Sequence, residues 1–392
     1  MILNSMGILS KNNSICIFYD ADYPSNQAGG EKRLFMLSQI AINKGFSVQW
    51  VSFNFWKSFN FSKIFFGIHH FGILPKPKFY NKNGNRNKRE PILYLINCFL
   101  CFPFFVRSKI WILGQWPMVH IFPLILLGLL LRKKIYVEWW ETLENQWLDR
   151  KGPGLLGITI EYFTLKMASF VTFVVDCESE KEIMLKKNKN AKVVVIPNGV
   201  DIKVFPKSDQ NYKFDFVSMC RLKNHKRVDL LIKATRKFID NTGMENTKVA
   251  IIGDGPEKDM LLSLTKDLNL EKNITFFGFI ENYNDAVSIL LSSKVGILTT
   301  VAGGKGSVLI SELFAAELPV LAIGSDQGID PRYIKEGING YITENISSLQ
   351  LSNLMIKIIK DNEKLIYMKN KLSIEKKSLD WEKILKNHPL FC

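Results

Sequence analysis

A glycine-rich segment followed by an apolar run is the feature that most restricts the fold of this chain. Residues 303–320 have the sequence GGKGSVLISELFAAELPV, and the apolar run VLAI begins at Val320, directly after Pro319. The pattern predicts a loop, a short helix and a buried strand. Backbone N–H groups of such a loop can point at an anion, and the positive end of the helix dipole adds to the attraction. An ordinary loop-to-helix connection has the same pattern, so a phosphate site and a plain connection both stay open.

The same order of elements is predicted near the N-terminus. An apolar strand over residues 14–20 leads into a loop that ends in Gly29 and Gly30, and a helix over 31–44 and a strand over 46–53 follow. A strand, a glycine turn, a helix and a second strand in this order are typical of a parallel sheet.

Strands and helices alternate through the rest of the chain. Strands are predicted over 109–114, 134–137, 171–176, 193–196, 214–219, 249–252, 274–277 and 295–299, and helices over 118–131, 229–240 and 257–268. The turn over 197–201 lies near the midpoint and is the expected hinge. We therefore expect an α/β protein with a Rossmann-like domain over 1–199, a second over 200–370, and a helical tail over 371–392 that packs back towards the first domain. Two such doubly wound domains are expected to face each other across a cleft.

Composition restricts the partners and the compartment only loosely. The 392 residues carry a formal net charge of +15, which favours an anionic partner such as a nucleotide or an acidic membrane face. Compositional drift in an AT-rich genome is an equally good explanation of that charge. Of the six cysteines, only Cys98 and Cys101 form a CxxC pair, and no further zinc ligands accompany them. The thiols are therefore expected to be buried and reduced, as in a cytosolic protein.

Two apolar stretches raise the question of a membrane. Residues 91–106 and 121–131 are both shorter than the about 20 residues that a spanning helix needs. The first residues, 1–13, lack the basic and apolar regions of a signal peptide. Together with the basic stretch 76–89, the apolar stretches suit docking on an anionic leaflet. The expected location is the cytoplasm, as a peripheral protein on the inner face of the cytoplasmic membrane.

Five short motifs occur in a recognisable order. They are IPNGVD (196–201), CRL with Lys226 and DLLIKA (220–234), IIGDGPE (251–257), ELFAAELPV (312–320) and EGINGY (336–341). In this order they resemble the GT-B glycosyltransferases of family 4, also called glycosyl transferases group 1, and the resemblance covers residues 14–345. It implies retaining transfer of a sugar from a nucleotide diphosphate sugar to a glycan or lipid-linked acceptor. It also implies a role in cell-surface polysaccharide or lipopolysaccharide synthesis, with no metal or other cofactor.

The resemblance assigns a donor site to the second domain. Arg221 and Lys226 would clamp the diphosphate and stabilise the leaving group, which makes them the expected catalytic residues. Glu312 would accept hydrogen bonds from the ribose hydroxyls. The alternative for Arg221 and Lys226 is a solvated basic loop, and the alternative for Glu312 is a surface carboxylate.

Backbone groups complete the expected donor site. Gly306, Ser307 and Val308 would offer N–H groups to the phosphates, and Gly29 and Gly30 would close on the diphosphate from the first domain. For the last two, a tight turn is the alternative.

The chain departs from the family pattern at three positions in the second domain. The family has an acid eight positions before the counterpart of Glu312, where it contacts the transferred sugar, and this chain has Gly304 there. Cys220 and Glu317 stand where the family has Gly. The sequence therefore supports nucleotide binding more firmly than it supports catalysis.

The acceptor side departs as well. The family has a histidine after a strand like 134–137, and Trp140 is expected at that position. Trp139, Trp140 and Glu141 are expected on the acceptor side, and Glu138 is the expected catalytic acid or base. Tryptophan is more often a core residue than a sugar-stacking one, so burial is the alternative for both rings.

Other functions stay open to different degrees. A non-catalytic GT-B partner or scaffold that retains nucleotide binding is the main alternative, because of Gly304 and the missing histidine. An epimerase of nucleotide sugars fits the motifs less well. Nucleic-acid binding is disfavoured, because the basic residues are dispersed and no recognition module is present.

Overall fold

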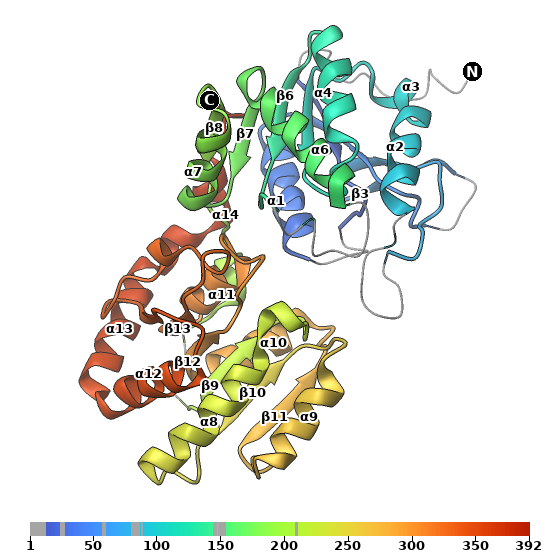
Figure 1. Ribbon diagram of the computed structural model, residues 1–392. Coiled ribbons are helices and arrows are strands. Elements are labelled where there is room, and N and C mark those ends of the chain that lie inside the picture. Colours follow the sequence, from blue (N-terminus) through green and yellow to red (C-terminus); the bar gives the residue numbers. More distant parts are fainter. Residues whose placement is uncertain are drawn as a thin grey trace. The chain divides into compact units, whose positions relative to one another are not determined.

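The computed structural model describes residues 13–23, 28–56, 60–79, 87, 89–143, 147, 154–207 and 211–392. Contacts divide the chain into two compact units (Figure 1). The first unit comprises Met1–Pro197 and Leu385–Cys392, and the second comprises Asn198–Ile384. The boundary between the two units, between Pro197 and Asn198, lies inside the turn over 197–201 that was expected as the hinge. The returning tail is shorter than expected, because residues 371–384 group with the second unit.

An eight-stranded sheet forms the first unit. Its spatial order is β3 (Ser62–Phe65), β4 (Ile68–Phe71), β2 (Ser47–Val51), β1 (Ser14–Phe18), β5 (Ile110–Gly114), β6 (Lys134–Glu138), β7 (Thr172–Val175) and β8 (Lys192–Val195). All neighbours pair in parallel except β3 and β4. Strand order reverses between the adjacent strands β1 and β5, which makes the sheet doubly wound.

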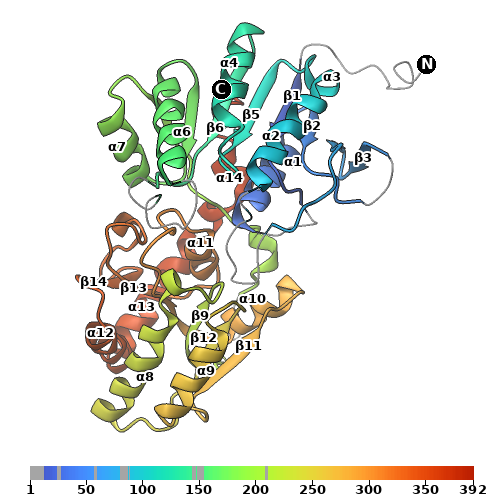
Figure 2. The same ribbon diagram turned by 45° about the vertical axis from the view of Figure 1, so that its right-hand side comes forward.

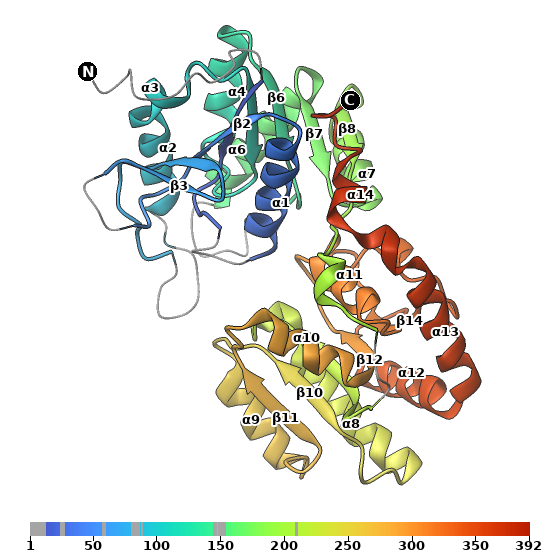
Figure 3. The ribbon, with the colours of Figure 1, turned by 180° about the vertical axis from the view of Figure 1, so that it is seen from behind.

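Helices cover both faces of this sheet. They are α1 (Gly29–Asn43), α2 (Glu90–Leu100), α3 (Phe102–Phe105), α4 (Ile121–Leu130), α6 (Gly154–Lys166) and α7 (Glu178–Lys187). Alternate residues of β1 point to opposite faces: Cys16 and Phe18 join a core with α2, α4 and α6, whereas Ile15 and Ile17 lie against Leu37 of α1. Figure 1 shows α4 and α6 in front of the sheet, and Figure 3 shows α1 from the other side.

The β3–β4 hairpin was not expected from the sequence. Its two turn residues, Phe66 and Gly67, both have positive φ, at 51° and 76°. Two consecutive residues with positive φ match the twist of a tight hairpin, and Gly67 is the sequence signal for it. Most of the basic stretch 76–89 lies outside the described residues.

A six-stranded parallel sheet forms the second unit. Its spatial order is β11 (Ile274–Gly278), β10 (Val249–Ile252), β9 (Phe214–Met219), β12 (Ser293–Leu298), β13 (Val320–Ile323) and β14 (Gly340–Thr343). In chain order this is the Rossmann arrangement 3-2-1-4-5-6. Its helices, labelled in Figure 2, are α8 (Val228–Thr242), α9 (Lys258–Asp267), α10 (Tyr283–Leu291), α11 (Val308–Ala315), α12 (Ser348–Lys360), α13 (Asn362–Glu375) and α14 (Trp381–Leu385).

Strand residues of the second sheet alternate between two cores. Phe216 and Ile251 belong to the core under α8 and α12, and Val217 and Ala250 belong to the core under α11. The expected loop, short helix and strand after residue 303 are present as α11 and β13. Among the described residues, no helix is both long enough and apolar enough to cross a membrane.

Candidate functional site

The loops that follow β9 and β12 are hydrogen-bonded to each other in the second unit. Thr299 Oγ1 donates to the Lys226 carbonyl at 2.6 Å, and the Val301 N–H donates to the His225 carbonyl at 2.9 Å. The strands β9 and β12 are neighbours at which the strand order reverses. Ligands of open α/β sheets bind outside the carboxyl ends of strands at such a point. The structure thus brings the predicted basic loop and the predicted glycine loop together.

A glycine turn supports the loop that carries Arg221. Gly253 has a φ of 131°, and a Cβ there would lie 1.9 Å from the Cys220 carbonyl oxygen. A Cβ at Gly255 would lie 2.3 Å from the Leu222 carbonyl oxygen. The IIGDGPE motif therefore needs glycine at both positions, because the backbone of residues 220–222 runs directly against it.

The two predicted clamp residues differ in exposure. Arg221 is exposed and Lys226 is half-buried. Burial raises the pKa of the Cys220 thiol to about 11, and the nearby Lys226 ammonium acts in the opposite direction. Arg221 and Lys226 thus lie in the same loop, at the carboxyl end of β9. Their contact with a diphosphate stays a prediction.

The glycine loop is fixed through its carbonyl groups. Asp330 N–H donates to the Lys305 carbonyl at 3.0 Å, and the Asn198 side-chain amide donates to the Gly306 carbonyl. The Ser307 N–H donates to the Gly304 carbonyl at 3.2 Å. One of the three expected phosphate donors, the Ser307 amide, is therefore already engaged. Val308 begins α11, and first-turn amides of a helix have no intrahelical acceptor. Phosphate binding by the Gly306 and Val308 amides stays a prediction.

Glu312 is buried within α11 and accepts a hydroxyl hydrogen bond. Its Oε1 atom accepts from the Tyr283 hydroxyl at 2.7 Å. This is the type of bond expected between Glu312 and a ribose. Tyr283, at the start of α10, was not singled out from the sequence, because nothing near it in the chain points to Glu312.

A side chain at position 304 would crowd the side chain of Thr300. A Cβ at Gly304 would lie 2.8 Å from Thr300 Cγ2, closer than side-chain carbons pack. Where the family has an acid, this chain thus has a glycine, and the Thr300 methyl group lies close to where the acid's Cβ would be.

Gly30 packs closely in the first unit. A Cβ on Gly30 would lie 2.7 Å from the Trp140 ring and 2.9 Å from the Tyr19 hydroxyl. Gly29 is exposed at the first turn of α1. The need for glycine at position 30 therefore comes from the ring of Trp140, and its contact with a diphosphate stays a prediction.

Gln115 fixes the backbone after β6. Its Oε1 atom accepts from the N–H groups of Trp140 and Glu141 at 2.9 and 3.0 Å, and its Nε2 group donates to the Glu141 carbonyl. Trp140 and Glu141 are half-buried, so an acceptor role is open to both. Gln115 itself was not predicted, although it directly follows strand β5.

Trp139 was expected on the acceptor side, and this expectation is wrong. The side chain is fully buried, its ring lies 5.7 Å from that of Phe173, and its indole N–H donates to Thr142 Oγ1 at 3.0 Å. An indole with its one donor satisfied inside the core has no surface left for a sugar.

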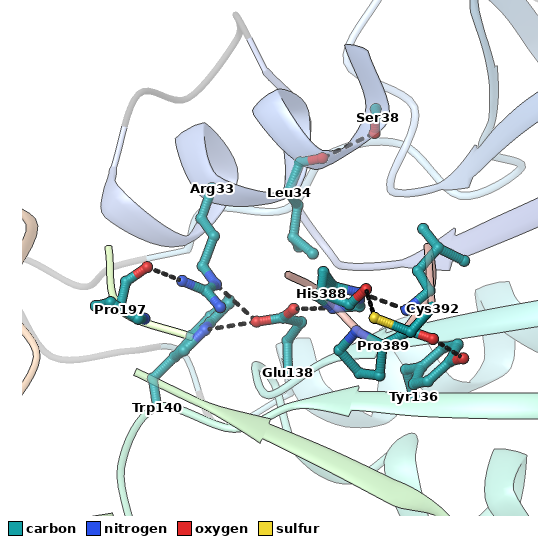
Figure 4. Close-up of polar contacts among 11 residues, drawn as sticks. Arg33, Leu34, Ser38, Tyr136, Glu138, Trp140, Pro197, His388, Pro389 and Cys392 are labelled. Atoms are coloured by element: carbon teal, nitrogen blue, oxygen red, sulfur yellow. Dashed lines mark hydrogen bonds and ion pairs between the residues drawn. The ribbon is translucent and has the colours of Figure 1, made fainter. Parts of the chain in front are cut away.

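Glu138 was expected as a catalytic residue, and the structure places it in a buried ion pair. The carboxylate is inaccessible, Oε2 accepts from Arg33 Nε at 2.7 Å, and Oε1 lies 3.0 Å from His388 Nε2 (Figure 4). Burial alone would raise the pKa of Glu138, but the Arg33 guanidinium and the His388 hydrogen bond lower it to about 2. A buried anion with both oxygens engaged is suited to positioning other groups, and proton transfer by Glu138 stays a prediction.

The cysteines and histidines of the described residues form no metal site. Within the residues that the structure describes, no group of three or more His, Cys, Asp or Glu side chains could hold a metal ion. All six cysteines are free thiols. Four are buried as expected, but Cys220 is half-buried and Cys392 is exposed. Burial raises the pKa of Cys16, Cys98 and Cys101, which keeps these thiols protonated.

Comparisons with known proteins extend these observations. Residues 201–372 match the family model described as Glycosyl transferases group 1. The chain is 27% identical over 195 residues to an N-acetyl-alpha-D-glucosaminyl L-malate synthase of Bacillus anthracis, which covers 47% of this chain and 48% of that protein. It is 27% identical over 236 residues to a UDP-Gal:alpha-D-GlcNAc-diphosphoundecaprenol alpha-1,3-galactosyltransferase of Escherichia coli, which covers 56% of this chain and 59% of that protein.

A solved structure resembles almost the whole chain. Sucrose-phosphate synthase from Thermosynechococcus elongatus has a TM-score of 0.75 at 15% identity and covers 95% of this chain and 96% of its own. The predicted α/β class and GT-B fold are thereby confirmed. In sequence, the chain spans about half the length of the curated relatives it matches.

Proposed function

We propose that the chain is a retaining glycosyltransferase, because residues 201–372 match the family model of glycosyl transferases group 1. Its substrates are a nucleotide diphosphate sugar and a glycan or lipid-linked acceptor, and its pathway is cell-surface polysaccharide or lipopolysaccharide synthesis. The observation that carries this proposal is the pair of hydrogen bonds joining the loop after β9, which contains Arg221 and Lys226, to the loop after β12, which leads into the glycine-rich segment.

The proposed chemistry follows from the charges at that point. A diphosphate gains charge as the glycosidic bond breaks, and Arg221 and Lys226 offer a planar fork and a point charge to it. The start of α11 adds oriented N–H groups at Gly306 and Val308. The departing nucleoside diphosphate is stabilised without a metal or another cofactor. Glu312 holds the ribose from the same helix.

Substitution of the clamp residues tests this proposal. In the purified protein, released nucleoside diphosphate is measured with UDP-, GDP- and ADP-sugars for wild type, Arg221→Ala and Lys226→Ala. Each substitution is expected to lower kcat/KM by about 100-fold, because a charge-assisted contact to the leaving group is lost. Arg236→Ala removes a half-buried cation that pairs with Asp240 on α8 and is the matched control. Equal activity in all four proteins would contradict the site assignment.

A non-catalytic role is the second candidate, and the Gly304–Thr300 contact favours it. The acid that would touch the transferred sugar is absent, and Thr300 fills part of its place. In this case the protein binds a nucleoside diphosphate, as calorimetry with UDP, GDP and ADP would detect, but releases none from any donor. Release from one donor excludes this candidate.

We also propose that the first unit docks on an anionic membrane leaflet from the cytoplasmic side. Helix α2 is apolar on its outer face, where Ile92, Ile96 and Phe99 are 57%, 45% and 49% exposed. Its inner face, with Tyr94 and Cys98, is buried in the core. A helix that is apolar on both faces requires a second apolar partner.

Other helices of the first unit also expose large apolar side chains. Leu130 of α4 is 80% exposed, and Leu155 of α6 is 77% exposed. Within the described residues 89–143 and 154–170, the exposed charged side chains are all basic, among them Arg107, Arg132 and Lys166. Apolar surface with a basic border is attracted to anionic lipid, the setting of a lipid-linked acceptor.

A further inference from the structure

Buried hydrogen bonds hold both residues of the peptide that joins the two units. Pro197 is the last residue of the first stretch of the first unit, and Asn198 is the first residue of the second unit. Arg33, on the helix that follows Gly29, donates to the Pro197 carbonyl, and Asn198 donates to the Gly306 carbonyl. Pro197 is thus bound to α1, and Asn198 is bound to the glycine loop of residues 303–307.

In the first unit, the bond to Pro197 is part of a buried ion pair. The Arg33 side chain is only 1% exposed, its Nη1 group donates to the Pro197 carbonyl at 3.1 Å, and its Nε group donates to Glu138 at 2.7 Å (Figure 4). A guanidinium that lost either acceptor would keep unpaired donors in a medium of low dielectric. The ion pair therefore strongly favours one position of the Pro197 carbonyl.

His388 completes the ion pair from the end of the chain. The Leu390 N–H donates to His388 Nδ1 at 3.1 Å, so this nitrogen carries no proton. The Nε2–H group is then the donor to Glu138 Oε1 at 3.0 Å. His388 is neutral in this arrangement, and it satisfies the oxygen of Glu138 that Arg33 does not.

In the second unit, Asn198 fixes the last peptide before α11. Its side chain is 7% exposed and donates to the Gly306 carbonyl, and its own carbonyl accepts from Ser311 Oγ at 2.8 Å. A planar peptide points its C=O and N–H groups in opposite directions. The Gly306 carbonyl is held by Asn198 and the Ser307 N–H by Gly304, so both ends of this peptide are fixed.

We propose that Asn198 and Arg33 are positioning residues for the glycine loop of residues 303–307. Asn198 sets the orientation of the loop directly, and Arg33 sets it through the adjacent Pro197 peptide. The conformation of the glycine loop thus depends, through Pro197, on the buried ion pair between Arg33 and Glu138. The inference rests on the proposed function only where it predicts nucleotide affinity.

Amide hydrogen exchange of the ligand-free protein tests the positioning role. In Asn198→Ala, exchange of the amides of residues 304–309 is expected to be about 10-fold faster than in wild type, because the loop loses a buried hydrogen bond. Thr265→Ala is the matched control, since it removes a buried hydroxyl that bonds only to the Leu261 carbonyl of its own helix, at 2.8 Å. Unchanged exchange in Asn198→Ala, or equal acceleration in the control, overturns the proposal. Should Asn198→Ala not fold, Ser311→Ala removes one of the two bonds and is expected to give a smaller acceleration at the same amides.

Arg33→Lys tests the part played by the first unit. Lysine keeps the positive charge but cannot bond Glu138 and the Pro197 carbonyl with one fork. Exchange at residues 304–309 is expected to rise by about threefold. Ser38→Ala, which removes a bond to the Leu34 carbonyl within α1, is the control. No acceleration in Arg33→Lys overturns the role of the ion pair.

Calorimetry with UDP, GDP and ADP separates this inference from the proposed function. Asn198→Ala is expected to bind the preferred nucleotide about 10-fold more weakly than wild type and Thr265→Ala. Equal affinity in all three proteins overturns the positioning role while leaving the proposed function intact. If wild type binds none of the three nucleotides, the proposed function fails, and the exchange rates still decide the positioning role.

Discussion

The lack of a side chain at Gly304 is linked to the Thr300 side chain that faces it. Gly304→Ala is expected to lower the free energy of unfolding by about 1–2 kcal/mol, because the new Cβ would meet Thr300 Cγ2 at 2.8 Å. In a Thr300→Ser background the same substitution is expected to cost less than half as much, since the methyl group is gone. Urea unfolding of the four proteins gives this double-mutant cycle. Additive effects would contradict the steric link.

An acid restored at position 304 is expected to need the same second change. The resemblance to family 4 places an acid there in contact with the transferred sugar. Gly304→Glu should therefore fold better with Thr300→Ser than without it, and only the double variant tests whether the acid raises the rate of transfer.

Asp176, which follows β7, is expected to make the first unit less stable as pH rises. Burial raises the pKa of this carboxyl from 3.8 to about 7, with Arg33 acting in the opposite direction. Between about pH 4 and 7 the unfolded chain has lost this proton and the folded chain still holds it, so unfolding becomes easier. Asp176→Asn should remove the effect. At pH 8 its free energy of unfolding should exceed that of wild type by about 2–4 kcal/mol.

Urea unfolding at pH 4 and pH 8 measures this difference. All tryptophans except Trp381 lie in the first unit, so their fluorescence reports mainly on it. Asp240→Asn changes an exposed carboxyl on α8 and should alter the pH dependence little. The proposed titration would be ruled out if Asp176→Asn and wild type differed in free energy of unfolding by the same amount at pH 4 and pH 8.

Glu317 shows how another departure from the family pattern is accommodated. It stands where the family has Gly, and its φ of 61° lies in the left-handed region that favours glycine. Its Oε1 atom accepts from Ser373 Oγ at 3.2 Å and from Lys376 Nζ at 3.4 Å. These contacts with α13 and the turn after it offset the backbone strain.

At the scale of single elements, the outer faces of α2 and α4 predict membrane binding. The double variant Phe99→Gln, Leu130→Gln is expected to bind about 10-fold less to vesicles of phosphatidylcholine with phosphatidylglycerol, because two apolar side chains no longer enter the lipid. Binding of wild type should also fall as salt is added or phosphatidylglycerol is left out. Sedimentation with vesicles measures both effects.

The matched control for this prediction lies in the second unit. Phe279 and Ile374 are 73% and 75% exposed there, and Phe279→Gln, Ile374→Gln should leave vesicle binding unchanged. Equal binding of wild type to vesicles with and without the anionic lipid would contradict the role given to the basic border.

Most strands and several helices could be predicted as elements. The strands β9 and β10 have the expected bounds, and α8 extends the expected helix by one residue at its start and two at its end. Their residues repeat with the period of one structure and end at turn residues, both of which are local signals. The β3–β4 hairpin was missed because its exposed strand β3 carries no strong apolar alternation.

At the scale of the whole molecule, the order of the strands follows from the chain and general rules. Alternating strands and helices joined by short connections give parallel doubly wound sheets. The extent of the returning tail did not follow. Only residues 385–392 group with the first unit, because His388 and Pro389 bond there to Glu138 and Tyr136.

The sequence by itself determined the two α/β units, the GT-B fold and the loops that carry Arg221, Lys226 and Glu312, because periodicity and turn residues act over a few neighbours. The tertiary structure alone decided that Glu138 is a buried anion and that Trp139 is a core residue. The partners of Glu138, Arg33 and His388, lie 105 and 250 residues away in the chain. Burial and charge pairing depend on what the fold brings close, and no local pattern contains that information.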